Sequence, residues 1–226
     1  MTTNKRILVF APHPDDEILG VGGTIARNIK EGNKVYVCVI TKGMPPLFND
    51  KQRNQQNQDD AKRCHQFLGI TKSFFLDFPA ADLESVKRFE LNGRILDVIK
   101  EVRPDEVFIP HIGDMQKDHQ IVVDACMVAL RPKYFPQVKK ILAYETLSET
   151  DWNLPNVTNA FIPNVFINIE DTLEIKKEAL SFFSQQVSDF PDTRSIEAVV
   201  ALARHRGALM HWCAAEAFML IRELEN

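Results

Sequence analysis

The chain has 226 residues, of which 45% are hydrophobic and 26% charged, as is ordinary for a globular domain with a large core. Its net charge of −4 and the absence of a basic tract argue against a general nucleic-acid or membrane-surface binder. No segment approaches the about 18 apolar residues of a membrane span, and the apolar run near the N-terminus is too short for a secretory signal. We therefore expect a cytoplasmic protein, whose four scattered cysteines remain reduced.

Strand and helix patterns alternate along the chain. The expected strands cover residues 7–10, 34–41, 73–76, 106–109, 140–145 and 164–169, with a further edge strand at 218–222. The expected helices cover residues 18–31, 59–67, 83–102, 119–130, 172–183 and 195–209, with 54–58 as an exposed start of the second. This order predicts a Rossmann-like α/β fold, a mostly parallel sheet with helices on both faces, in a single domain over residues 1–226.

One turn carries an unusual density of polar groups. His13, Asp15, Asp16 and Glu17 follow directly after the first expected strand and precede the first expected helix. The carboxyl edge of such a sheet is where α/β folds bind ligands. Burying three carboxylates there is costly without a cation, and helix capping explains only one of them. We therefore predict a divalent metal held by His13 and Asp16, with Asp15 spare to act as a base.

These residues resemble the opening His-Pro-Asp-Asp-Glu signature of the PIG-L (LmbE-like) zinc-dependent de-N-acetylases. A second block, Pro110 to His119, is similar to the family's Asp-x-His-x-Asp-His motif, with Asp114, Asp118 and His119 aligned. A weaker match lies near the C-terminus, where Arg206-Gly207 is followed by residues 215–218 with the sequence Ala-Glu-Ala-Phe. The resemblance runs from residue 7 to about residue 222.

The resemblance implies His119 as the third metal ligand, beside His13 and Asp16. Three N and O ligands with an open position suit catalytic Zn²⁺, and Mn²⁺, Fe²⁺ or Co²⁺ stay open alternatives. Both motifs end expected strands on one edge of the sheet, which favours a single site. We expect Glu17, Asp118 and Asp114 to orient the ligands rather than bind the metal, with a contact to a sugar hydroxyl also open for Asp114.

Gln116 is the main departure from the family pattern, because a histidine stands there in relatives with the full motif. Glutamine donates a hydrogen bond to an oxyanion but has no proton to transfer. Either Asp15 carries both proton transfers, or His111 or His211 supplies the second. For His211 we expect a structural role. For His111 a role in the site and a purely structural role both stay open. Arg53, in the loop region where the family contacts substrate, is a candidate for binding a substrate phosphate or carboxylate, with a solvated arginine at least as favoured.

The function that the resemblance implies is metal-dependent removal of the acetyl group from an N-acetylated amino sugar of the N-acetylglucosamine type, with release of acetate. The expected partner is a small or conjugated amino sugar, without nucleic acid, and a homo-oligomer stays open. Two alternatives remain. One is a hydrolase of another amide or ester, and the other is a metal-binding sugar-recognition protein with little turnover. Asp15 argues against the pure binder, which has no need of a spare carboxylate.

Overall fold

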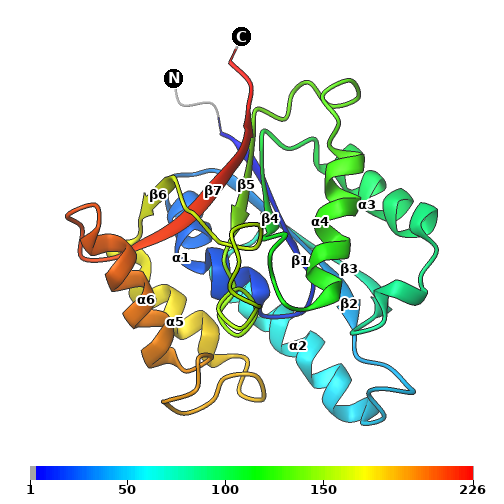
Figure 1. The fold of residues 1–226 in the computed structure, drawn as a ribbon, viewed down its shortest axis with the longest axis horizontal. Coiled ribbons are helices and arrows are strands. Elements are labelled where there is room, and N and C mark those ends of the chain that lie inside the picture. The colour runs from blue at the N-terminus through cyan, green and yellow to red at the C-terminus, as the bar shows by residue number, and fades with distance from the viewer. Residues whose placement is uncertain (1–3, 226) are drawn as a thin grey trace.

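The computed structural model describes residues 4–225, in which one mixed sheet runs through the molecule (Figure 1). Its strands are β1 (Arg6–Ala11), β2 (Lys34–Lys42), β3 (Lys72–Pro79), β4 (Glu106–Pro110), β5 (Lys140–Tyr144), β6 (Val165–Asn168) and β7 (Ala215–Glu223). They lie in the order β3-β2-β1-β4-β5-β7-β6. The first five are parallel, and β7 is antiparallel to both of its neighbours. The predicted α/β class is confirmed.

Helices cover both faces of the sheet. They are α1 (Asp16–Lys30), α2 (Lys51–Leu68), α3 (Arg88–Val102), α4 (Lys117–Ala129), α5 (Leu173–Ser181) and α6 (Ile196–Ala208), with two short 3₁₀ turns, η1 (Leu83–Ser85) and η2 (Glu170–Thr172). The helices α3 and α4 cover one face and α1, α2 and α5 cover the other (Figure 1). Their apolar side chains form one core cluster with each face of the sheet. The strands between the two layers are therefore nearly continuous hydrophobic runs, as parallel strands buried on both faces are. In the described residues, no helix is both long and apolar enough to cross a membrane.

The strand order reverses between β1 and β4. The chain moves outward from β1 through β2 to β3, then returns to pair β4 on the other side of β1. At such a switch point the connections leave the two strands in opposite directions and open a crevice at their carboxyl ends. The segments that follow β1 and β4 are the two polar motifs. The fold thus brings them together although about a hundred residues separate them.

The helix expected over residues 83–102 is broken. It forms the turn η1, an extended stretch at Val86 and Lys87, and only then α3. The carboxylate of Asp118 accepts the backbone N–H of Leu83 at 3.2 Å and that of Ala81 at 2.6 Å. The interruption itself lies at Val86 and Lys87, whose backbone is extended, and Asp118 holds the segment that precedes it.

The expected edge strand at residues 218–222 is wrong in position. It begins earlier, as β7, and lies inside the sheet between β5 and β6, so that β6 forms the edge. The four residues Ala215 to Phe218 are buried, which an edge position does not provide. Periodicity indicated a strand there but held no information on its neighbours.

Candidate active site

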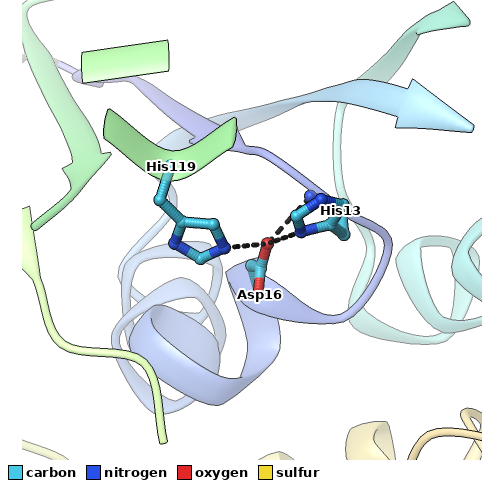
Figure 2. Close-up of side chains that lie close together, drawn as sticks. All are labelled: His13, Asp16 and His119. Carbon is cyan, nitrogen blue, oxygen red and sulfur yellow. Dashed lines mark hydrogen bonds and ion pairs between the residues drawn. The ribbon is translucent and has the colours of Figure 1, made fainter. Parts of the chain in front are cut away.

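Three side chains from the two motifs meet at the switch point (Figure 2). His13 comes from the turn after β1, Asp16 is the first residue of α1, and His119 lies in the first turn of α4. Asp16 Oδ2 lies 3.2 Å from His13 Nδ1 and 3.3 Å from His119 Nε2. One ligand atom of each residue lies within 4.8 Å of the others. This is the set that the sequence predicted to hold a metal.

The donor atoms of this group fit a cation. Asp16 Oδ1 and His119 Nε2 are buried without a hydrogen-bond partner among the described residues. Leaving such atoms unpaired is costly, and a divalent ion bound between them removes the cost. Two imidazole nitrogens and a carboxylate oxygen are the donors that Zn²⁺ prefers in catalytic sites.

Each histidine of the group is held by a second carboxylate. Asp118 Oδ2 lies 3.0 Å from His13 Nε2, and Asp114 Oδ2 lies 2.8 Å from His119 Nδ1. Carboxylates in these positions fix the ring orientation and leave the other nitrogen of each ring free for a metal. Burial lowers the pKa of both imidazoles, but the surrounding carboxylates raise it more. The resulting pKa is about 9 for His13 and about 10 for His119.

Asp15 lies in the same turn but outside the ligand group. Its backbone is left-handed, with φ of 113°, and its N–H donates to Glu17 Oε2 at 3.2 Å. The other oxygen of Glu17 lies 2.9 Å from His65 Nε2, and His65 Nδ1 lies 2.8 Å from Ser73 Oγ. Glu17 thus stabilises a backbone conformation that a non-glycine residue rarely adopts. Burial raises the pKa of the Asp15 carboxyl to about 7, against the opposing charge of Arg194.

Two charged residues near Asp15 escaped the sequence analysis. Arg194 Nη1 lies 3.0 Å from Asp15 Oδ2, and its Nε donates to Ser148 Oγ at 2.7 Å. Glu149 lies on the far side of the guanidinium, with Oε1 3.7 Å from Arg194 Nη2. Glu149 follows β5, which lies beside β4 in the sheet. Its position after the carboxyl end of a neighbouring strand is the one feature of the sequence that could have indicated a role in the site. Arg194 precedes α6 and belongs to no motif.

The remaining candidates are dispersed. Gln116 is the half-buried N-cap of α4, three residues before His119. His111 is buried, and its Nε2 lies 3.0 Å from the carbonyl oxygen of Asn159, so this nitrogen is engaged by a loop. His211 is exposed in the turn after α6, and Arg53 is exposed in the first turn of α2. Catalytic roles for Gln116 and His111, and substrate binding by Arg53, stay predictions.

The C-terminal match packs against α1. Glu216 accepts the backbone N–H of Gly23 at 2.9 Å and of Thr24 at 2.8 Å, and the Lys176 ammonium donates to it and to the Leu19 carbonyl. A buried ion pair therefore satisfies backbone groups in the middle of the helix that begins with Asp16. This places the Ala-Glu-Ala-Phe segment as a support for the site rather than a part of it.

The sequence of this chain matches one protein family and several curated relatives. A sequence model of the PIG-L family, described as GlcNAc-PI de-N-acetylase, matches residues 8–130. The chain is 30% identical over 190 residues to the uncharacterized deacetylase YaiS of Escherichia coli, covering 79% of this chain and 91% of that one. It is 25% identical over 195 residues to the diacetylchitobiose deacetylase of Thermococcus kodakarensis, covering 83% and 71%.

Solved structures share the fold. The A40926 pseudoaglycone deacetylase Dbv21 has a TM-score of 0.77 at 20% identity, covering 99% of this chain and 100% of that one. GalB, a 4-carboxy-2-hydroxymuconate hydratase from Pseudomonas putida, has a TM-score of 0.76 at 19% identity, covering 98% and 99%. A deacetylase and a hydratase are thus equally similar in fold, so the fold does not assign the reaction. The family match and both polar motifs establish that the chain belongs to the PIG-L family.

Proposed function

We propose that this protein is a metal-dependent hydrolase that removes the acetyl group from an N-acetylated amino sugar of the N-acetylglucosamine type. The observation that carries the proposal is the spare carboxylate of Asp15, buried beside a group of metal ligands that does not include it. Relatives named as deacetylases of such sugars supply the substrate class. The residues alone support only a metal hydrolase with a carboxylate base.

His13, Asp16 and His119 are the residues that would hold the metal, and Zn²⁺ is our choice for it. Bound there, the ion supplies Lewis-acid activation of the acetamide carbonyl and of a water molecule, whose pKa falls toward about 7. Asp118 and Asp114 keep the two imidazoles oriented for this purpose. In this proposal three of these side chains bind the metal and the two carboxylates orient the imidazoles. None of the five transfers a proton.

Asp15 is the general base in this proposal. Burial raises the pKa of its carboxyl toward neutral pH, and a base that titrates there both accepts and releases a proton readily. The left-handed turn and its bond to Glu17 fix the carboxylate, while Arg194 stabilises its charged form. Asp15 removes a proton from the attacking water.

Gln116 is proposed as a hydrogen-bond donor to the oxygen of the scissile carbonyl. It is the N-cap residue of the helix that carries His119, three residues before that histidine. An amide donates without changing protonation, and such a donor stabilises negative charge that develops on the oxygen. This is the role that remains for the position once the imidazole of the family motif is absent.

The proposal is tested by measuring acetate release from zinc-loaded protein. The panel contains N-acetylglucosamine and N,N′-diacetylchitobiose, and an O-acetylated sugar without an N-acetyl group as comparison. Acetate together with an equal amount of free amine from an N-acetylated sugar supports the proposal. Release only from the ester favours the alternative hydrolase. Tight sugar binding without turnover favours the recognition protein.

A further inference from the structure

Glu149 is a buried carboxylate with an oxygen that the rest of the fold leaves unpartnered. The residue is 8% exposed, and its Oε2 atom has no hydrogen-bond partner among residues 4–225. Its Oε1 atom forms an ion pair with Nη2 of Arg194 at 3.7 Å, which is longer than a hydrogen bond. Folding gains little from such a group, because desolvating a carboxylate costs several kcal/mol by order of magnitude. A ligand that donates to Oε2 accounts for its presence.

The backbone places Glu149 between the two halves of the active site. Its carbonyl oxygen accepts the N–H of Met115 at 3.0 Å, directly before Gln116. Its neighbour Thr150 donates to Asp114 Oδ1 at 2.6 Å, and Asp114 in turn holds His119. The loop after β5 is therefore attached to the second motif at two points. Glu149 is fixed in place by that loop, while Oε2 of its carboxylate has no hydrogen-bond partner among the described residues.

Arg194 connects Glu149 to the proposed base. Nη1 binds Asp15 and Nη2 faces Glu149, so the two carboxylates lie on neighbouring nitrogens of one planar guanidinium. Asp15 acts at the carbonyl carbon, where water attacks. Because Arg194 contacts both carboxylates, Glu149 belongs to the same part of the site as Asp15 and is the second carboxyl available for the amide nitrogen.

We propose that Glu149 is a catalytic residue that donates a proton to the nitrogen of the scissile amide as the amine departs. The inference rests on the proposed deacetylase function. Asp15 takes one proton from the attacking water. The C–N bond breaks, and the nitrogen keeps the electron pair and takes the proton of Glu149. The products are acetic acid and the free amine, and the proton on Asp15 returns to Glu149 through water, so the cycle consumes none.

The surroundings of Glu149 are consistent with a carboxyl that retains its proton. Burial raises its pKa above the ordinary value, and Asp16 on α1 adds to the rise. His119 on α4, His13 in the turn before α1 and Arg194 before α6 oppose it. Gln116, at the position where the family motif has a protonatable ring, has no proton to give.

Glu149→Gln tests the inference, because it preserves shape and removes the transferable proton. Asp151→Asn is the matched control, since Asp151 is an exposed carboxyl on the same loop. With N,N′-diacetylchitobiose and zinc-loaded protein, Glu149→Gln should lower kcat by about 10²-fold or more, as loss of a general acid does. KM, metal content and melting temperature should change little. The basic limb of the kcat–pH profile should disappear, which a merely structural role does not produce. Asp151→Asn should stay near the wild type.

A binding measurement tests the contact between Glu149 and the amine nitrogen without requiring turnover. Calorimetry compares D-glucosamine with D-glucose, which differ at the amine that Glu149 is proposed to contact. The wild type should prefer glucosamine, and Glu149→Gln should lose about tenfold of that affinity while glucose binding is unchanged.

The outcomes separate the two proposals. A wild type that releases no acetate contradicts the proposed function, and the glucosamine comparison then decides the role of Glu149 alone. A wild type that turns over, with Glu149→Gln within tenfold of it and an intact basic limb, overturns the inference. The inference is also overturned if the wild type binds glucosamine no more tightly than glucose, or if Glu149→Gln loses affinity equally for both sugars.

Discussion

Arg194 binds the carboxylate of Asp15 at 3.0 Å although 179 positions separate the two residues in the chain. The guanidinium favours the charged form of Asp15, while burial favours the neutral form and holds the pKa at about 7. Arg194 also donates to Ser148 Oγ. The segment before α6 therefore contributes directly to the electrostatics of a turn that follows β1.

Removing this guanidinium should change the pH profile. In Arg194→Met the pKa of Asp15 should rise further, because the opposing charge is gone. The acidic limb of kcat/KM should then move to higher pH, since a base must be deprotonated to act. Activity at pH 7 should fall about tenfold and partly recover at pH 9. Steady-state kinetics across this range measure the effect.

Arg194→Lys and Arg204→Met are the controls. The lysine keeps a positive charge and should restore much of the profile, and Arg204 is an exposed arginine on α6 whose loss should have no effect. An unshifted acidic limb in Arg194→Met would show that the ion pair does not set the titration of the base.

Chelation should make the stability of the protein depend on alkaline pH. His13 and His119 have folded-state pKa values of about 9 and about 10, above their ordinary value of 6.5. Raised pKa values mean that the folded protein binds these protons more tightly than the unfolded chain does. The two protonated histidines therefore contribute to the free energy of unfolding, and the contribution is complete below pH 6.5. It is lost as pH rises through 9 and 10. The melting temperature of protein treated with a chelator should therefore fall over this window.

The zinc-loaded protein is the comparison, because a metal-bound imidazole has no proton to lose there. Its melting temperature should lack the alkaline fall, and zinc affinity should increase with pH as protons are displaced. Parallel curves for the chelated and loaded proteins would mean that these histidines do not form the metal site.

Gln116 and His111 should behave differently on substitution. If Gln116 donates to the oxyanion, Gln116→Ala should lower kcat by roughly 10²–10³-fold at most and leave the basic limb unchanged. His111 binds the Asn159 carbonyl, so His111→Ala should instead cost about 1–3 kcal/mol of stability by leaving that group unpaired. Kinetics and thermal denaturation of both variants, each checked for metal, separate these effects. A severe rate loss in stable His111→Ala with a mild Gln116→Ala would reverse the assignment.

The sequence predicted the α/β class and the pair His13 and Asp16 because both depend on local patterns, and the resemblance to the PIG-L family supplied His119. Alternating strands and helices put the carboxyl ends of parallel strands at one edge, so both motifs were expected there, and the structure adds that β1 and β4 are neighbours. His13 and Asp16 are three residues apart on a strand-to-helix turn, which needs no long-range information.

Features that depend on partners distant in sequence were not predictable. Asp118 holds the segment before the break in the expected helix by accepting the amides of Ala81 and Leu83, a contact between residues far apart in the chain. The interior place of β7 depends on which strands it pairs. Arg194 and Glu149 enter the site through loops, where neither periodicity nor a motif indicates which charged residue turns inward. Composition cannot distinguish them from solvated charges.

The central claim is that Asp15 acts as the base beside a metal held by its neighbours. Asp15→Asn tests it most directly, with metal content and acetate release from N,N′-diacetylchitobiose measured on the same preparation. The account predicts wild-type zinc content and a kcat lower by roughly 10²–10⁴-fold. A variant that keeps its metal and retains a rate within tenfold of the wild type would contradict it.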